Sequence, residues 1–262
     1  MSFRNTFVAE LRKAVTLPAT WVALAVTLLG SVGVTVLNAV AVRAALDSVA
    51  RESVASYSAF DTAYAAVPLG TVGAVVIGVV VMSSEYAANR TDAGSGRQIT
   101  ATLTASPRRT GLLVAKALTV VLLVAITAAA TIPASAAVAR LLIGAGPPET
   151  VSLDDALVRS VGAALYWTLT GLMALAITTL ARSGIIPLIV LIVNSSLVSF
   201  SLLLTNVTPL AHWLPDMAGR RLFLGMPTVE GGLDTGPGAV VMAAWTLALL
   251  AVAGVVLSRR DA

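Results

Sequence analysis

Long apolar stretches alternate with short polar segments along the whole chain. Six of these stretches are nearly free of charge and reach the roughly 20 residues that a helix needs to cross a bilayer core of about 30 Å. They lack the period-two alternation of membrane β-barrel strands. The pattern predicts an all-α membrane protein, a single transmembrane domain over residues 1–262 with six transmembrane helices. The predicted spans are 19–42, 65–83, 117–139, 160–181, 184–205 and 238–257.

Composition narrows the class of protein in the same direction. Hydrophobic residues make up 57% of the 262 residues and charged residues only 11%, whereas soluble domains carry about 25% charged residues. A soluble globule is excluded because so few charges cannot cover its surface, and a disordered chain is excluded because it would be poor in apolar residues. The absence of cysteine excludes disulfides and cysteine-ligated metals.

The charges are divided unequally between the two sides of the predicted membrane. The segments 1–18, 84–116 and 258–262, together with Arg182, hold 11 of the 17 Lys and Arg residues, but only 4 of the 13 acids. Because basic residues mark the cytoplasmic side, both termini are predicted to be cytoplasmic. The sequence pI of about 10.0 then follows from topology, and no nucleic-acid partner is expected.

Residues 2–17 have the pattern of an amphipathic helix. Phe3, Phe7, Leu11 and Ala14 recur at spacings of three and four, as on one face of a helix. We expect this helix to lie in the membrane interface in contact with lipid, the alternative being a solvated cytoplasmic lead-in. Pro18 is expected to end it before the first span.

The polar segment 84–116 is the longest one on the predicted cytoplasmic side. Ile99 and Leu103 would share a helical face with Thr102. Such a cytoplasmic coupling helix, with one apolar stripe, suits the docking of a soluble partner, although an ordinary loop would also fit. Lys116, near the start of the third span, is expected to extend back to the cytosol.

Two regions carry polar groups close to the predicted spans. Asn194, Ser195 and Ser199 lie within the fifth span, where they would bond neighbouring helices or line a pathway. The segment 206–237 is rich in proline and in apolar residues. It predicts a re-entrant-like outer segment that dips into the outer leaflet where protein covers its backbone. A small-residue ridge, Gly70, Ala74 and Gly78, predicts close helix packing within or between chains.

Several kinds of chemistry have no sequence signature here. The chain has no G-x-x-x-x-G-K-[ST] phosphate loop, so it would not bind ATP in that manner. His212 is its one histidine and is expected to be an interfacial polar tip. The predicted spans hold no Asp, Glu, Lys, Arg or His, which argues against ion coupling. We therefore expect no catalytic, cofactor or metal site in this chain.

The order of these features resembles the permease subunits of ABC-2-type transporters, which have the type V exporter fold. The local likeness lies in Glu85-Tyr86, in the run from Gln98 to Arg109 and in Lys116. Glu10-Leu11-Arg12-Lys13 near the start is also similar. In one departure, Glu85 and Pro107 lie further apart than in the common family pattern, which affects the register of the coupling helix.

The resemblance implies a permease in the bacterial plasma membrane that works as part of an ATP-driven exporter. A second permease copy, identical or different, would complete the pathway, and a separate ABC ATP-binding subunit would bind ATP-Mg. This chain itself would not be an enzyme and would hold no cofactor. The implied coupling residues are Glu85, Tyr86, Gln98, Ile99, Thr102, Leu103, Ser106, Pro107, Arg108 and Arg109.

Three alternatives remain open at this point. The chain would also fit a six-span substrate-binding subunit of an uptake system, a membrane-embedded enzyme or a scaffold. An uptake subunit would not explain Glu85-Tyr86, and an enzyme would need a cluster of reactive groups at membrane depth. For an exporter, a pathway lined by hydroxyl, amide and apolar groups favours an amphipathic or lipid-like cargo.

Overall fold

The computed structural model describes residues 2–47, 58–86, 109–144, 151–195, 199–224 and 231–259, and all regular structure in these ranges is helical. Two short 3-10 turns, η1 (Pro209–Trp213) and η2 (Arg220–Leu222), flank α11. The α-helices are α1 (Phe3–Thr16), α2 (Pro18–Leu46), α4 (Ala59–Tyr64), α5 (Val67–Ser83), α7 (Arg109–Ile143), α8 (Leu153–Ala181), α9 (Ile185–Ser195), α10 (Phe200–Thr205), α11 (Pro215–Gly219) and α12 (Thr235–Arg259).

Five helical segments in the described residues are long and apolar enough to cross a membrane. They are α2, α4 together with α5, α7, α8 and α12. Each contains one of the predicted spans, and most extend several residues beyond it. The fold therefore matches the expectation of an all-helical, multi-pass membrane protein.

The fifth predicted span is not a continuous membrane-length helix. The stretch 184–205 is divided between α9, with 11 residues, and α10, with 6. At about 1.5 Å per residue, α9 reaches only about half of a bilayer core. Ser199 caps the start of α10 by accepting a hydrogen bond from the Leu202 backbone N–H. Because this polar cap lies inside an apolar run, a prediction from hydrophobicity alone treats the two helices as one.

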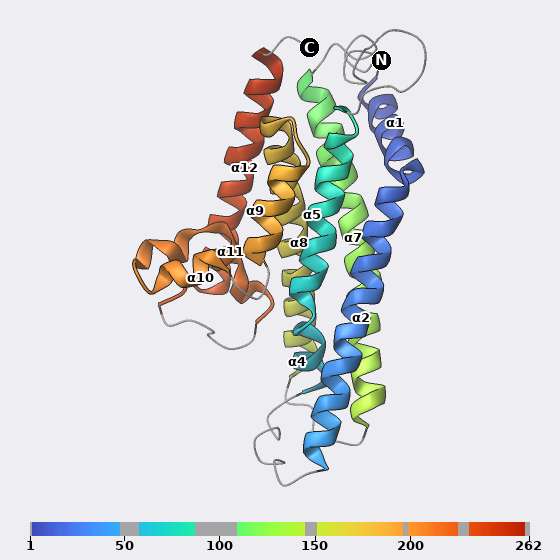
Figure 1. The fold of residues 1–262 in the computed structure, drawn as a ribbon, viewed down its shortest axis with the longest axis vertical. Coiled ribbons are helices and arrows are strands. Elements are labelled where there is room, and N and C mark those ends of the chain that lie inside the picture. Colours follow the sequence, from blue (N-terminus) through green and yellow to red (C-terminus); the bar gives the residue numbers. More distant parts are fainter. Residues whose placement is uncertain are drawn as a thin grey trace.

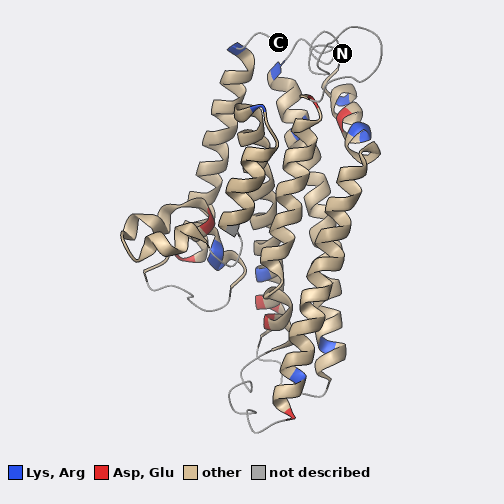
Figure 2. Cartoon of the chain, viewed as in Figure 1, with Lys and Arg blue, Asp and Glu red and all other residues tan. Residues whose placement is uncertain are grey.

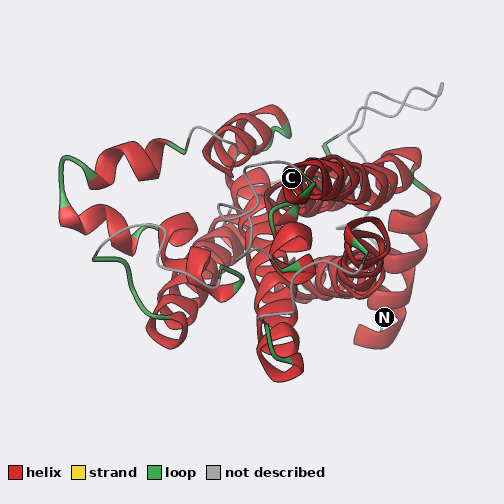
Figure 3. Ribbon diagram, turned by 90° about the horizontal axis from the view of Figure 1, so that it is seen from below, coloured by secondary structure: helices red, strands yellow, loops and turns green. Residues whose placement is uncertain are grey.

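Helices α5 and α8 form the centre of the bundle, whereas α2 and α12 lie at its periphery (Figure 1), and the view from below shows helices and loops throughout the described residues (Figure 3). In the most apolar window of α4–α5, and likewise of α8, 67% of residues are buried, against 22% for α2 and for α12. The exposed sides of the peripheral helices carry large apolar residues such as Leu29, Leu37 and Leu247. This outward apolar surface suits contact with lipid.

The predicted ridge of small residues packs against α8 of the same chain. A Cβ atom on Gly70 would lie 1.9 Å from the Trp167 side chain, and one on Gly78 would lie 2.1 Å from the Gly171 carbonyl oxygen. No side chain fits at these distances, so the glycines allow α5 and α8 to approach closely.

Both chain ends lie at the same end of the bundle, which we call the terminal end (Figure 1). Helix α1 packs on α7 there, and Leu17 ends α1 immediately before Pro18 begins α2, as predicted. Charged residues lie mainly toward the helix ends and in the lateral block, while the middle of the long helices is largely free of charge (Figure 2).

The segment from α10 to η2 forms a compact lateral block beside the bundle (Figure 1). Helix α11 packs on the first half of α12, and α10 and η1 pack on each other. Gly238 permits this contact, because a Cβ atom there would lie 2.2 Å from the Ala218 carbonyl oxygen. The block is therefore helical and packs on the bundle.

Candidate functional site

Four charged side chains meet at the terminal end, in what we call the terminal-end cluster: Glu10, Lys13, Glu85 and Lys116. The Lys116 Nζ donates hydrogen bonds to Glu10 Oε2 at 2.5 Å, to Glu85 Oε1 at 2.8 Å and to the Val81 carbonyl oxygen at 3.1 Å. Lys13 donates to Glu85 Oε1 as well. All three donors of the Lys116 ammonium are therefore used.

This cluster joins three helices that are distant in the sequence. Glu10 and Lys13 come from α1, Lys116 lies two turns into α7, and Glu85 lies in the turn that follows α5. Both Glu85 and Lys116 are fully buried. Two acids and two bases neutralise one another, which is what burial of charge requires. The cluster thus fixes the ends of α5 and α7 relative to α1.

The pKa of Glu85 reflects its surroundings. Burial raises the pKa of this carboxyl group, but the charges and hydrogen bonds of Lys116 and Lys13 outweigh burial and lower it below its ordinary value. Glu85 is therefore a carboxylate at neutral pH, held by its two lysine partners.

One expectation at this end is wrong. Lys116 does not extend to the cytosol but is fully buried and paired. The expected amphipathic helix is present as α1, which buries Thr6, Glu10 and Ala14 and leaves Phe3 exposed. Pairing with Lys116 favours burial of the face that carries Glu10, and contact of Phe3 with lipid stays a prediction.

The segment predicted to couple to an ATPase starts and ends beside this cluster. Tyr86 Oη donates a hydrogen bond to the Thr179 carbonyl oxygen of α8, and Arg109 Nη1 donates one to the Leu257 carbonyl oxygen of α12. Glu85 is buried, so any effect of its side chain on a docked partner passes through the helices it joins. The remaining predicted coupling residues, Gln98, Ile99, Thr102, Leu103, Ser106, Pro107 and Arg108, lie outside the described residues.

A cavity of about 520 Å³ lies between the bundle and the lateral block, and we call it the Asp216 cavity. Residues of α2, α4, α5, α8, α9, α10, α11 and η2 line it, and most of them are apolar or aromatic. Cavities of roughly 300–1,000 Å³ with apolar walls and a few polar groups are typical of small-molecule sites. The polar side chains on its wall are Tyr64, Thr71, Tyr166, Asn194, Asp216 and Arg220.

Asp216 is the buried charged group among the described residues that line this cavity. Its side chain is almost entirely buried, and its Oδ2 accepts a hydrogen bond of 2.9 Å from Ser199 Oγ. Its Oδ1 has no hydrogen-bond partner in the part of the chain that the structure describes. Arg220, four residues further on, forms no ion pair with Asp216 within 4.0 Å.

The residues predicted to line a pathway fall near this cavity. Asn194 lies on its wall, and the Asn194 side-chain oxygen also accepts hydrogen bonds from the backbone N–H and hydroxyl of Ser201. Ser199 holds Asp216 in place. Ser195 ends α9, but its side chain lies outside the described part of the chain. Asn194 therefore links α9 to α10 and lies on the cavity wall, while a role in a pathway stays a prediction.

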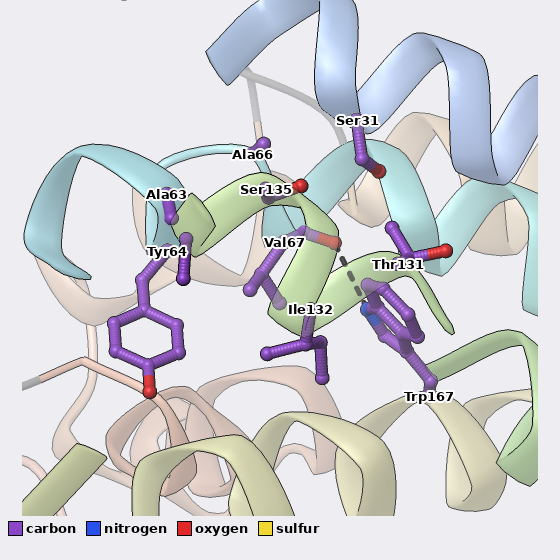
Figure 4. A pocket seen from close by; sticks show the side chains of 10 residues that line it. Ser31, Ala63, Tyr64, Ala66, Val67, Thr131, Ile132, Ser135 and Trp167 are labelled. Atoms are coloured by element: carbon purple, nitrogen blue, oxygen red, sulfur yellow. Dashed lines mark hydrogen bonds between the residues drawn. The ribbon is translucent and has the colours of Figure 1, made fainter. Parts of the chain in front are cut away.

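A second, much smaller cavity of about 10 Å³ lies in the bundle (Figure 4). The hydroxyls of Ser31, Thr131 and Ser135 line it without hydrogen-bond partners in the described residues. On its other side, Trp167 Nε1 donates a hydrogen bond of 3.0 Å to the Val67 carbonyl oxygen. Its size and its hydroxyl groups suit one water molecule, not a cargo.

The polar wall of the Asp216 cavity includes residues that the sequence pattern does not single out. Asp216 and Arg220 lie in the segment 206–237, where only prolines and apolar residues stand out. The sequence signal for Asp216 is weak: Pro215 at the first position of a helix, followed by an acid in the first turn. The tyrosines Tyr64 and Tyr166 carry no signal, because each sits in an apolar run.

An ion pair supports the cavity from the side away from the terminal end. Arg159 Nη2 donates to Asp61 Oδ1 at 2.8 Å, Arg159 Nε donates to the Phe223 carbonyl oxygen, and the guanidinium lies 4.3 Å from the Tyr64 ring centroid. Helix α4, α8 and the chain after η2 are thus joined through one side chain.

The expectation for His212 is also wrong. Its side chain is buried in η1 instead of forming an exposed interfacial tip, and its Nδ1 has no hydrogen-bond partner in the described residues. Trp213, its neighbour, is exposed, and its carbonyl oxygen accepts a hydrogen bond from Trp245 Nε1. No group of three or more potential metal ligands occurs in the described part of the chain.

Comparison of the sequence with models of protein families finds no match, and comparison with curated proteins finds none either. The resemblance to ABC-2-type permeases therefore depends on the residues and their arrangement alone.

Proposed function

We propose that this chain is the membrane-spanning permease subunit of an ATP-driven ABC exporter. The observation that carries the proposal is the terminal-end cluster, because the residues of the family-like motifs, Glu10, Lys13, Glu85 and Lys116, contact one another. Motif residues separated by up to 106 positions meet at one point, which unrelated sequence coincidences would not be expected to do.

The position of this cluster supports a coupling role. It joins the helices α5 and α7, between which the proposed coupling segment lies, and Tyr86 and Arg109 contact α8 and α12. A force applied to the segment by an ATP-binding subunit would therefore act on four helices together. We propose that the segment binds that subunit from the cytoplasm, with both termini on the same side.

The lateral block supports the same proposal. A half-length α9 followed by short helices α10 and α11 fits an outer segment that enters the membrane and returns, since irregular backbone at that depth must be covered by protein. Counting α9 as a partial crossing gives six passes and leaves both chain ends on one side. In the proposal, a second copy of the permease completes the pathway in a bacterial plasma membrane.

The experiment is co-expression with the ATP-binding subunit encoded nearest to this gene, followed by purification through a tag on the permease. We expect a stable complex that hydrolyses ATP, while the purified permease alone hydrolyses none. Failure to obtain any complex with such a subunit, or ATP hydrolysis by the permease alone, would contradict the proposal.

The coupling segment is tested separately by cross-linking, because the chain has no native cysteine. A single cysteine in place of Gln98 is expected to cross-link to the ATP-binding subunit, and the matched control is a cysteine in place of the exposed Val207 after α10. Arg108→Glu is expected to weaken the complex. Substituting the buried Glu85 would instead disturb the fold, so that position does not report on docking.

A further inference from the structure

The Asp216 cavity holds a charged group that the coupling role leaves unexplained. Burying a carboxylate without full pairing is costly, and ionisable groups at membrane depth commonly mark substrate sites. In the terminal-end cluster two acids and two bases compensate one another's charge. In the described residues, by contrast, the Asp216 carboxylate accepts one hydrogen bond, from Ser199. Asp216 lines a cavity of about 520 Å³, so a cationic ligand in this cavity would lie beside an incompletely paired carboxylate.

The other walls of the cavity suit an apolar ligand body. Leu69, Val72, Leu202 and Leu224 line it. Tyr166 and Phe223 add an aromatic wall, with their ring centroids 5.1 Å apart in a tilted arrangement. Aromatic rings combined with a carboxylate are the groups that proteins use to bind organic cations.

Arg220 is the one basic side chain among the described residues of the cavity wall, and its charge is the main argument for an anionic ligand. It is only partly buried, whereas Asp216 is almost entirely buried. A long guanidinium side chain can place its charge in water while its stem covers apolar surface. The charge that a ligand in the cavity would meet without solvent screening is therefore that of Asp216.

We propose that the Asp216 cavity binds the cargo and that the cargo is an amphipathic organic cation. Its cationic group would lie beside the Asp216 carboxylate, and its apolar body would occupy the space between Tyr166, Phe223 and the leucines. This inference deepens the proposed exporter function by naming a cargo class. Binding is measured on the permease alone, so its failure is distinguishable from failure of the ATPase complex to form.

The probe is radiolabelled tetraphenylphosphonium, an apolar cation, and its matched counterpart is tetraphenylborate, which has nearly the same shape and the opposite charge. Equilibrium binding is measured on the full chain in nanodiscs, with empty nanodiscs of the same lipid subtracted. We expect saturable binding of tetraphenylphosphonium that tetraphenylborate does not displace.

Three variants connect binding to the charge. Asp216→Asn is expected to weaken tetraphenylphosphonium binding about tenfold or more, because a desolvated charge contact is lost, and Asp216→Glu is expected to restore most of it. Arg220→Gln is expected to tighten binding about two- to threefold, because a nearby like charge is removed. Thermal unfolding of each variant verifies that the fold is retained.

The proposal is overturned if no saturable binding of the cation occurs, or if Asp216→Asn binds it as tightly as the original chain. It is equally overturned if tetraphenylborate is the ligand that binds and Arg220→Gln abolishes its binding, because the cavity would then recognise anions.

Discussion

The terminal-end cluster and the Asp216 cavity bury charge in opposite ways. In the cluster, Lys116 uses all three of its donors and Glu85 accepts from two lysines. In the cavity, one oxygen of Asp216 has no hydrogen-bond partner in the described residues, and Arg220 is no closer than 4.0 Å. The charged groups of the cluster contact one another and join helices, whereas the charge of Asp216 lies beside open space in the cavity.

This difference separates a structural role from a binding role. A neutralised network gains its stability inside the protein and has no free group to offer a ligand. An incompletely satisfied carboxylate costs stability, and proteins commonly accept such a cost at sites of function. The comparison therefore predicts that substitutions in the cluster change the folding stability, whereas the substitution that neutralises the cavity changes ligand binding.

The largest expected effect is that of Lys116→Met. The substitution leaves the two carboxylates of Glu10 and Glu85 with Lys13 as the remaining base of the cluster. Removing one partner of a buried ionic group commonly costs about 3–5 kcal/mol. The free energy of unfolding in detergent is the measurement. The matched control is Lys13→Met, which is expected to cost less because Lys13 is partly exposed. Equal effects of the two variants would contradict a central role of Lys116.

The second effect is a dependence of stability on acid. The pKa of Glu85 is lowered in the folded chain, so its contribution is present above the ordinary pKa of a glutamate, about 4.3, and is lost as the pH falls through the lowered value. Unfolding of the original chain and of Glu85→Gln is compared from neutral pH down to about pH 3. The original chain is expected to lose more stability over this range, and parallel curves would refute the assignment.

A smaller effect is expected from Ser199→Ala in the lateral block. The variant removes the one hydrogen bond to Asp216 Oδ2 and the cap of α10, with a cost of about 1 kcal/mol. Tetraphenylphosphonium binding is expected to weaken only a few-fold, since the charge remains. The control is Ser201→Ala, which keeps the Asp216 contact and should leave binding as it is.

The smallest effect on stability is expected from Asp216→Asn. Neutralising a buried carboxylate that lacks full pairing is expected to change the free energy of unfolding by less than about 1 kcal/mol, or to raise it slightly. The same variant is expected to lose cation binding. If Asp216→Asn instead unfolded as readily as Lys116→Met, the distinction between the two regions would fail.

Much of the bundle could be predicted from sequence because membrane spans depend on local composition. The stretches 19–42, 117–139 and 238–257 each lie within one observed helix, and Pro18 separates α1 from α2 as expected. The ridge at Gly70 also packs as expected, although only the structure identifies its partner as Trp167 of α8. Each of these features depends on residues that lie within a few helical turns of one another in the sequence.

The features that were not predicted depend on distant partners. Nothing near Lys116 indicates that Glu10, 106 residues away, will neutralise it, so a lysine close to a span end was expected to reach water. The stretch 184–205 was expected to be one span because Ser199 acts as a cap only once Asp216 and Leu202 are positioned. The Asp216 cavity, likewise, exists only where the lateral block meets the bundle.

The most direct test measures whether ATP binding by a subunit docked on the proposed coupling segment moves the lateral block. Cysteines replace the exposed Leu37 on α2 and Val207 after α10, and spin labels on them report the distance distribution in the permease–ATPase complex in nanodiscs. We predict that ATP with vanadate shifts the distribution and that the permease without its ATPase shows no shift. An unchanged distribution in the complex, or the same shift without the ATPase, would contradict the function proposed for this chain.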